Sequence, residues 1–238
     1  EEDEVKIGGE RFLEFTARCC KEGILPENCY CVRLYRTTYV GERLVNTTQV
    51  NYVNPLDRKQ ILEAEQELRH QMNSITNFLR KYVPGYEKCT IKTGASTLGI
   101  RESRRFAGEY VMDLSDLREA RRFPDVVVHK AQFVVDIHNP VGGGQANGIA
   151  EYVDAYDIPW RSLVPQKMEN LILAGRCISG THEAMASYRV MAIAMAIGEA
   201  AGIGAALAID HNVTPENLDV KYIQKALMDK GAVLFDEK

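Results

Sequence analysis

The pattern of apolar and polar residues predicts one long amphipathic helix in the first half of the chain. From Pro55 onward, apolar residues recur every three or four positions, the spacing that places side chains on one face of an α-helix. These apolar positions are Leu56, Ile61, Leu62, Leu68, Met72, Ile75 and Leu79. Asn54 is suited to cap the helix, and Pro84 with Gly85 ends the pattern. Charged residues between them, such as Glu63, are interpreted as a solvated face.

Short segments around this helix predict strands. They lie at residues 11–20, 30–39, 46–53, 90–99 and 126–137. In the second segment Tyr30, Val32 and Leu34 alternate onto one face, which is the period of a strand. A short helix is expected at residues 115–119, before the last of these strands. This part of the chain therefore mixes strands with helices.

A second pattern joins a short apolar run to a helix rich in small residues. Residues 171–174 read Leu-Ile-Leu-Ala, which has the length of a buried strand, and Gly175 allows the sharp exit that a strand-to-helix junction needs. The helix expected from Glu183 to Ile209 has Ala or Gly at nearly half of its positions. Its backbone can lie close to a strand or a flat ligand, and its N-terminus directs N–H groups toward an anion. A last helix is expected to begin at Thr214 as N-cap and to end at Gly231.

Composition restricts the classes of protein to which the chain can belong. With 238 residues, 45% of them hydrophobic, it can bury one large core or two small ones. A formal net charge of -4 and a pI near 5.8 argue against the basic excess of proteins that bind nucleic acid or anionic membranes. Residues 190–209 have the length of a membrane span, but they include Glu199 and lack aromatic and basic anchors on both sides. We therefore expect a buried helix, and neither a nucleic-acid nor a membrane partner.

The six cysteines do not have the spacing of a metal site. Cys19 and Cys20 are adjacent, and Cys29 and Cys31 are one residue apart, whereas zinc ribbons use paired CxxC motifs. Free, reduced thiols and no metal ligand are expected, and free thiols favour a cytoplasmic location. Cys177 lies in the glycine turn, and we expect it to pack there, because no second cysteine forms a CxxC pair with it.

A series of short motifs in one order carries a family resemblance. The motifs are GIRESRR at residues 99–105, GEY at 108–110, FPD at 123–125, DIHNP at 136–140, IPWRSLVP at 158–165, AGRCIS at 174–179 and YRV at 188–190. In this order they resemble one family of FAD-dependent oxidoreductases of the glutathione-reductase-like superfamily, over roughly residues 90–232. The resemblance implies FAD as cofactor, with a late strand, a glycine turn and a helix that close over its flavin end.

Flavoproteins of this superfamily bind the ADP half of FAD with a strand, a GxGxxG turn and a helix. No such unit occurs in these 238 residues, since the glycines at 142, 144 and 148 precede no helical pattern and are interpreted as a loop. We therefore predict the C-terminal portion of a longer protein, with an incomplete FAD site. The predicted fold is mixed α and β. Residues 1–133 would form mainly a substrate-binding α+β region, and residues 134–238 mainly the C-terminal strand–helix part of a Rossmann-like FAD domain.

Three arginines in the first motif are candidates for orienting an anionic group. On a strand, Arg101 and Arg105 would point to one face and Arg104 to the other. A guanidinium suits a substrate carboxylate, or the pyrimidine end of the flavin, which becomes negative on reduction. The alternative is that these arginines pair with nearby acidic residues such as Glu102.

Two histidines are candidates for proton transfer. His138 lies between Asp136 and a proline turn that would orient its ring. His182 lies at the start of the small-residue helix, where the helix dipole favours a neutral ring that could hydrogen-bond the flavin. For each histidine, a structural or solvated ring is the alternative.

The resemblance implies that the glycine turn contacts the flavin. The turn consists of Gly175, Arg176, Cys177, Ile178 and Ser179. Many superfamily relatives have an acidic residue at the position of Arg176, which binds the ribitol hydroxyls; here backbone groups and Ser179 are expected to substitute. Arg189, about two turns into the helix, is expected near the cofactor, where its charge would stabilise reduced flavin or a bound acid. A structural ion pair is the competing explanation.

Together these features predict an FAD-dependent oxidoreductase that transfers a hydride between a small organic substrate and flavin. The full-length protein would be active and this portion alone inactive. The expected partner is a small molecule that carries an anionic group. Two alternatives stay open: a non-catalytic substrate-binding or interaction module that lacks the FAD half, and an enzyme of different chemistry on an unrelated α+β fold.

Overall fold

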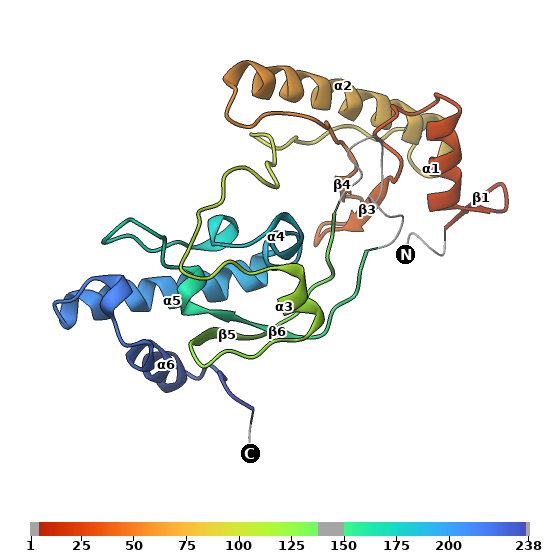
Figure 1. Ribbon diagram of the computed structural model, residues 1–238. Helices are drawn as coiled ribbons and strands as arrows, with labels where there is room; N and C mark the ends of the chain where they lie inside the picture. The colour runs from red at the N-terminus through yellow and green to blue at the C-terminus, as the bar shows by residue number, and fades with distance from the viewer. Residues whose placement is uncertain (1–4, 138–149, 237–238) are drawn as a thin grey trace. The chain divides into compact units, whose positions relative to one another are not determined.

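The computed structural model describes residues 5–137 and 150–236. The chain divides into two compact units, each with its own helices and strands (Figure 1). Of the described residues, unit 1 comprises residues 5–100, and unit 2 comprises residues 101–137 and 150–236. The predicted division at residue 133 separates a substrate-binding region from an FAD-binding region. A division into compact units does not test what each region binds, so this division stays a prediction.

Unit 1 packs two helices together. After a small hairpin of β1 (Lys6–Ile7) and β2 (Glu10–Arg11) comes helix α1 (Phe12–Lys21), followed by β3 (Arg33–Arg36), β4 (Arg43–Asn46) and the long helix α2 (Arg58–Tyr82). Phe15 of α1 lies against Phe78 of α2, with ring centroids 5.8 Å apart, and Tyr82 completes the aromatic cluster. These rings lie in a core that α1, α2 and the loops near residues 25–32 share.

The prediction of a strand at residues 11–20 was wrong, because this segment is helix α1. Its buried residues Phe12, Phe15, Thr16 and Cys19 are three or four positions apart, which is helical spacing. The short segment also fits an alternating pattern loosely. The helical period, which buries both phenylalanines on one side, determines the observed structure.

The predicted long helix is confirmed as α2, with a different first residue. Asp57 is the N-cap, and its carboxylate accepts from the N–H groups of Lys59 at 2.9 Å and Gln60 at 3.4 Å. Asn54 instead accepts from Leu56 N–H at 3.0 Å in the turn before the helix. The carboxylate is therefore the group that satisfies the free N–H groups of the first turn. The helix ends before Pro84, as predicted.

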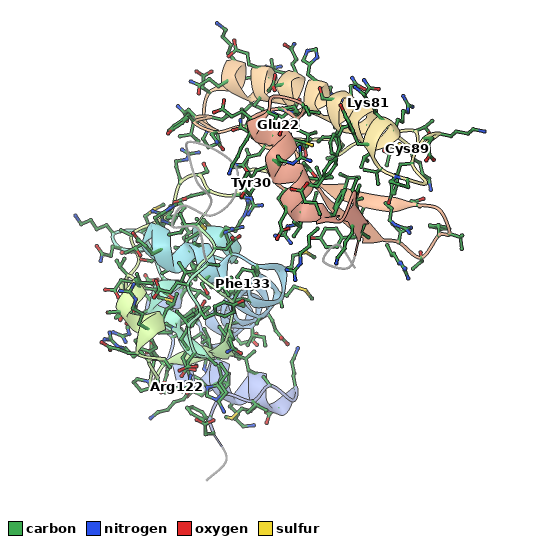
Figure 2. The ribbon with its side chains drawn as sticks, turned by 90° about the vertical axis from the view of Figure 1, so that its right-hand side faces the viewer. Glu22, Tyr30, Lys81, Cys89, Arg122 and Phe133 are labelled. Carbon is green, nitrogen blue, oxygen red and sulfur yellow. The ribbon has the colours of Figure 1, made fainter. Side chains whose placement is uncertain are left out.

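Two other predicted strands of unit 1 differ from the structure. The strand expected at residues 46–53 is shifted to β4, which pairs antiparallel with β3 in the register Leu34 to Val45. Beyond it, the backbone N–H and C=O of Gln49 bond to the side chain of Gln71 on α2, at 2.9 and 3.0 Å. Residues 90–99 form no strand. Around this segment, α2 side chains bind the backbone: Arg80 Nε donates to Cys89 O at 2.8 Å, where Figure 2 labels Cys89.

Unit 2 builds its core around a two-stranded antiparallel sheet of β5 (Val126–Ala131) and β6 (Tyr156–Pro159). The helix α3 (Leu114–Arg118) precedes β5, and the 3₁₀ turn η1 (Trp160–Ser162) follows β6. After the turn η2 (Gly175–Cys177) come α4 (His182–Tyr188), α5 (Met191–Asp210), the turn η3 (Pro215–Asn217) and α6 (Val220–Asp229). The helices α5 and α6 contact each other and β5 (Figure 1).

On its buried face, the small-residue helix α5 is closely approached by the side chain of Trp160. A Cβ atom added at Gly204 would lie 2.4 Å from Cη2 of Trp160. Ile193, Ile197, Ala200 and Ala208 are buried on the same face. The absence of a side chain at Gly204 therefore lets the indole lie directly against the helix backbone.

The opposite face of α5 is apolar and exposed. Met191, Met195 and Ile209 are 82%, 72% and 80% exposed, and no atom of a described residue lies within 4 Å of a Cβ added at Gly198 or Gly202. The helix is long and apolar enough to cross a membrane, with a mean hydropathy of 1.9, and a third of its most apolar window is buried. The expected buried helix is thus buried on one face.

Three expectations for unit 2 were wrong in detail. Residues 171–174 form no strand with any described residue; Leu173 N–H donates to Leu163 O at 2.8 Å. The single helix expected from Glu183 to Ile209 is two helices, because Val190 takes an extended conformation with ψ of 154°. The last helix begins at Val220 with Asp219 as cap, since residues 215–217 form a separate turn.

Other predictions for unit 2 are confirmed. The short helix near residues 115–119 is α3, and the strand expected from residue 126 is β5, which ends at Ala131. Gly231 follows the last helix with a φ of +94°, which suits glycine. The fold class, mixed α and β with small sheets, is as predicted.

Candidate functional site

Two motifs that lie 70 residues apart in the sequence are adjacent in unit 2. Phe106 N–H donates to Cys177 O at 3.2 Å, and Met112 N–H donates to Ser179 O at 3.2 Å. Thr181 N–H donates in turn to Met112 O at 2.8 Å. The strand-like segment that follows GIRESRR therefore runs beside the glycine turn, and the candidate arginines and the turn share one region.

The glycine turn begins with Gly175, whose φ of +68° is a conformation that favours glycine. The turn η2 follows, and Ile178 and Ser179 are fully buried beyond it. Ser179 N–H donates to Ser162 O at 2.9 Å. Its buried hydroxyl oxygen has no hydrogen-bond partner among the described residues. The turn is thus fixed by backbone hydrogen bonds and retains one polar group without a protein partner.

Gly108 allows this close packing. A Cβ at residue 108 would lie 2.7 Å from Ser179 Cβ and 3.0 Å from Val164 O. Real Cβ atoms do not approach neighbours so closely, so a larger residue at 108 would separate the two segments. The glycine of the GEY motif therefore has a packing role.

Arg189 lies at the break between α4 and α5 and points into the unit. Its Nη2 donates to Asp136 Oδ2 at 2.7 Å and to Asp136 O at 3.1 Å. Arg101 approaches the same carboxylate, with Nη1 3.4 Å from Oδ2. The side chains of Arg189 and Asp136 are 13% and 16% exposed, whereas that of Arg101 is 49% exposed. One carboxylate is therefore shared by a buried and an exposed guanidinium.

The charge around Arg189 is predominantly positive. Burial lowers the pKa of Arg189, and the neighbouring positive charge of Arg101 lowers it further; Asp136 opposes both effects, and Arg176 adds to the lowering. The guanidinium groups of Arg101 and Arg176 therefore both act on Arg189, and the carboxylate of Asp136 opposes them. An anion placed among them would gain favourable interactions from more than one guanidinium.

His182 is held by a second acidic residue of the first motif. Its Nδ1 lies 2.5 Å from Oε2 of Glu102. The other oxygen of Glu102 forms an ion pair with Arg105, whose Nε donates to Gly180 O at 2.8 Å. Arg105 thus binds both the carboxylate and the backbone two residues before His182. The three predicted residues Arg101, Arg105 and His182 all lie in this region of unit 2.

The remaining predicted residues have different outcomes. The segment that holds the arginines is not a strand, so Arg101 and Arg105 reach different partners and the predicted shared face does not form. Arg104 is exposed and makes no hydrogen bond or ion pair with a described residue. Cys177 Sγ donates to Ala174 O at 3.2 Å. His138 lies outside the described residues.

Two residues of this region were not predicted as site residues. Asp136 belongs to the DIHNP motif, and Glu102 lies between two of the candidate arginines. A sequence signal existed for both, since a buried arginine needs a carboxylate partner and a histidine near a backbone turn needs an orienting group. Which acid pairs with which base depends on contacts between distant segments, and sequence spacing does not give these contacts.

The donor groups of this region fit the polar edge of a flavin. The turn contributes backbone groups and the unpartnered Ser179 hydroxyl, and the arginines contribute positive charge. The helix α5 begins at the same break, and its N-cap Val190 offers no side-chain cap to the first N–H groups. Electron-rich carbonyl and ring nitrogen groups, or a negatively charged reduced ring, would match this donor set.

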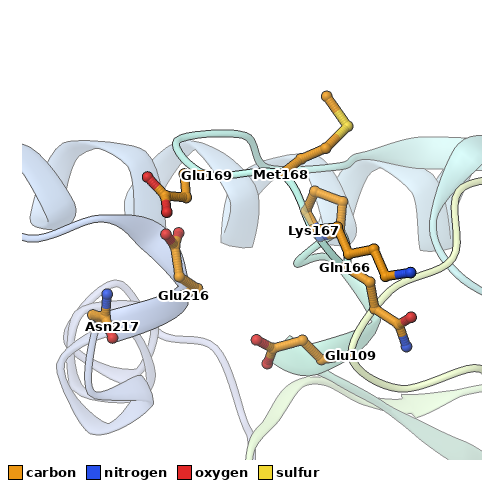
Figure 3. Close-up of a pocket in the computed structure, with 8 residues that line it drawn as sticks. Glu109, Gln166, Lys167, Met168, Glu169, Glu216 and Asn217 are labelled. Atoms are coloured by element: carbon orange, nitrogen blue, oxygen red, sulfur yellow. The ribbon is translucent and has the colours of Figure 1, made fainter.

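A separate pocket of about 800 Å³ lies elsewhere in unit 2 (Figure 3). Glu109, Glu169 and Glu216 line it together with Lys167, and Figure 3 shows the carboxylates of Glu169 and Glu216 facing each other. None of the predicted site residues that the structure describes lines this pocket. Because its charge is mainly negative, it does not suit an anionic substrate or a reduced flavin, and we do not place the site there.

The fold and this region define a class of protein: a mixed α and β protein with a cationic site built around a glycine turn and the start of a small-residue helix. The chain belongs to the FAD dependent oxidoreductase family, whose model matches residues 7–227. No curated protein and no solved structure matches the chain. Membership of this family implies FAD binding and a flavin-linked redox function.

Proposed function

We propose that this chain forms the flavin-facing and substrate-facing part of an oxidoreductase that transfers a hydride between a small anionic substrate and flavin. The observation that carries the proposal is the pair of guanidinium groups of Arg101 and Arg189 on Asp136, with the positive charge of Arg176, a residue of the glycine turn, close enough to lower the pKa of Arg189. When bound, FAD supplies the acceptor of the hydride. The protein supplies orientation, charge and a group that takes the remaining proton.

In this proposal the arginines hold negative charge. Arg189 is fixed by Asp136, so its guanidinium is oriented before any ligand binds. Arg101 and Arg176 are more exposed and can reach a carboxylate of the substrate or the reduced ring. A pre-oriented guanidinium loses less conformational entropy on binding than a flexible one.

The exposed face of α5 supports the further proposal that the FAD domain is completed by a segment outside these 238 residues. A helix in a layered α/β domain is covered by a sheet on one side, whereas the outer face of α5 carries exposed Met191, Met195 and Ile209. The glycine turn and this helix resemble the end of a glutathione-reductase-like FAD domain. The segment with the dinucleotide turn would then cover part of this face.

The visible absorption spectrum of the purified full-length protein tests the cofactor. We expect the bands of oxidised flavin in the full-length protein and none in the 238-residue chain. Absence of flavin from the full-length protein, even after FAD is added, would overturn the proposal. Flavin bands in the 238-residue chain would overturn only the proposal that its FAD site is incomplete.

Replacement of Arg176 tests the role of positive charge. In the full-length flavoprotein, Arg176→Gln should lower the two-electron reduction potential of the flavin by about 30 mV, which corresponds to about 1.4 kcal/mol. The reason is that one positive charge near the reduced ring is lost. Arg176 is exposed, so folding should not change. The matched control is Arg118→Gln, which removes an exposed arginine paired with Glu151; an equal shift in both variants would refute a local role for Arg176.

A further inference from the structure

Glu102 and His182 form a close contact that orients the histidine ring. Glu102 Oε2 lies 2.5 Å from Nδ1 of His182. A carboxylate at neutral pH only accepts hydrogen bonds, so Nδ1 must carry the hydrogen. In a neutral imidazole, the lone pair then lies on Nε2. The contact therefore selects one of the two tautomers of the ring.

The position of Glu102 is itself fixed. Arg105 forms an ion pair with the second carboxylate oxygen and donates from Nε to Gly180 O at 2.8 Å. This connects Glu102 to the backbone just before α4, which begins at His182. Glu102 is thus linked to residues 180–182 by two contacts: directly through His182, and through Arg105, which binds Gly180 O.

The two ends of the imidazole have different surroundings. The side chain of His182 is 50% exposed, whereas those of Glu102 and Arg105 are 26% and 25% exposed. No described residue forms a hydrogen bond with Nε2 of His182. The ring therefore presents its basic nitrogen away from the carboxylate, on a side chain that is half exposed.

We propose that Glu102 is a positioning residue that holds His182 in the tautomer able to take a proton at Nε2 during substrate oxidation. This rests on the proposed function. As the hydride leaves the substrate carbon for the flavin, the adjacent O–H or N–H bond breaks. Its proton forms a bond to Nε2, and its electron pair forms the double bond to carbon. The imidazolium that results is stabilised by the Glu102 carboxylate, which itself remains ionised.

A second carboxylate near His182 provides a control. Glu183 follows His182 on α4, and its pKa is lowered mainly by backbone hydrogen bonding and by the Thr181 hydroxyl, with a smaller effect of His182. No described hydrogen bond joins Glu183 to the imidazole. Removal of Glu183 therefore changes the charge near His182 while the contact at Nδ1 remains.

The tautomer can be measured without flavin or substrate. In a long-range ¹H–¹⁵N correlation spectrum of the ¹⁵N-labelled 238-residue chain at pH 8, we expect His182 to carry hydrogen on Nδ1. His182→Gln identifies its signals. In Glu102→Ala the hydrogen should move to Nε2, the tautomer that the free imidazole of histidine prefers. Glu102→Gln should restore the Nδ1–H form, because the amide oxygen also accepts, and Glu183→Gln should leave it unchanged.

Either of two results would overturn the inference: hydrogen on Nε2 of His182 in the unmodified chain, or an unchanged tautomer in a folded Glu102→Ala variant. Fluorescence of the single tryptophan, Trp160, and far-UV circular dichroism show whether each variant is folded. If Glu102→Ala does not fold, the comparison of Glu102→Gln with the unmodified chain and with free imidazole decides the question. Failure of the flavin assignment would be visible separately, in the absorption spectrum of the full-length protein.

Discussion

At the scale of single residues, the carboxylate of Asp113 shows how one side chain fixes a local structure. It accepts from Ser115 N–H at 2.8 Å, from Asp116 N–H at 3.2 Å and from the Ser115 hydroxyl at 2.6 Å. The hydroxyl contact is the main reason that the pKa of Asp113 is lowered. Asp113 N–H in turn donates to Asp116 Oδ2 at 3.0 Å, which completes a capping box.

We expect Asp113→Ala to lower the free energy of unfolding by about 1 kcal/mol at pH 7, the usual effect of losing an N-cap. Because the folded-state pKa is lowered, the stabilisation is present above the unfolded-state pKa of about 3.9 and is lost as the pH falls through the folded-state value. Urea unfolding at pH 7 and pH 3 should therefore show a smaller difference between the two proteins at pH 3. Asp154→Ala, at an exposed position, is the control and should have little effect at either pH.

The ion pair between Asp136 and Arg189 allows a second prediction at this scale. In Asp136→Asn the mostly buried Arg189 keeps its charge beside Arg101 without a carboxylate, and we expect a loss of about 2 kcal/mol in the free energy of unfolding. Sulfate should restore part of this loss, since it can bind the Arg189 guanidinium in place of the carboxylate. Glu151→Gln, in an exposed pair with Arg118, should cost less than about 1 kcal/mol. Equal effects in the two variants would contradict the inferred burial of the charge.

Individual residues also mark the limit of what the sequence could predict. The arginines of the GIRESRR motif could be selected as candidates from residue type alone, but their partners could not. Gln71 is a stronger case: it lies on the amphipathic helix, is 2% exposed, and binds both backbone groups of Gln49. From the sequence, a glutamine among apolar positions does not indicate that its side chain binds the backbone N–H and C=O of another segment, as a neighbouring strand would.

At the scale of elements, periodicity was informative where a segment was long and misleading where it was short. The helix α2 extends over 25 residues and was predicted with its end correct. The ten residues of α1 were read as a strand. The break between α4 and α5 had no proline or glycine to signal it; it coincides with the contact of Arg189 with Asp136, which joins segments distant in sequence.

The small residues of α5 have different roles that mutation can separate. Gly204→Ala should destabilise unit 2 by about 1–3 kcal/mol, because the new methyl group would lie 2.4 Å from the Trp160 ring. Gly202→Ala, on the same helix with nothing within 4 Å, should instead stabilise it by about 0.5–1 kcal/mol through helix propensity. Thermal unfolding followed by Trp160 fluorescence measures both. A similar sign for the two variants would mean that Trp160 does not pack on Gly204.

At the scale of the whole molecule, the two units have separate hydrophobic cores. The core of unit 1 includes Phe15 and Phe78, and that of unit 2 includes Trp160 and Ile197. The sequence allowed one large core or two small ones, and the fold class followed from the mixture of patterns. The boundary between the compact units did not follow, because unit 2 is built from two stretches that are separate in the sequence, residues 101–137 and 150–236 among those described.

Separate cores predict separate responses to core mutations. Phe78→Ala should destabilise unit 1 by about 3–5 kcal/mol, visible by circular dichroism, while the unfolding transition seen by Trp160 fluorescence stays nearly unchanged. Ile197→Ala should shift the fluorescence transition, because Ile197 belongs to the core that contains Trp160. Coincident shifts of both signals in the Phe78 variant would show that the units unfold as one.

The contact of Gly108 with Ser179 also bears on how this protein can vary. Residue 108 has no side chain to bind a ligand, yet any side chain there would meet Ser179 and separate the segment with Arg105 and Glu102 from the segment with His182. In a library of random variants selected for activity, position 108 should therefore tolerate as few replacements as the histidine itself. Exposed positions of unit 2 should tolerate more replacements. One of the positions in this region that tolerates fewest is therefore a residue without a side chain.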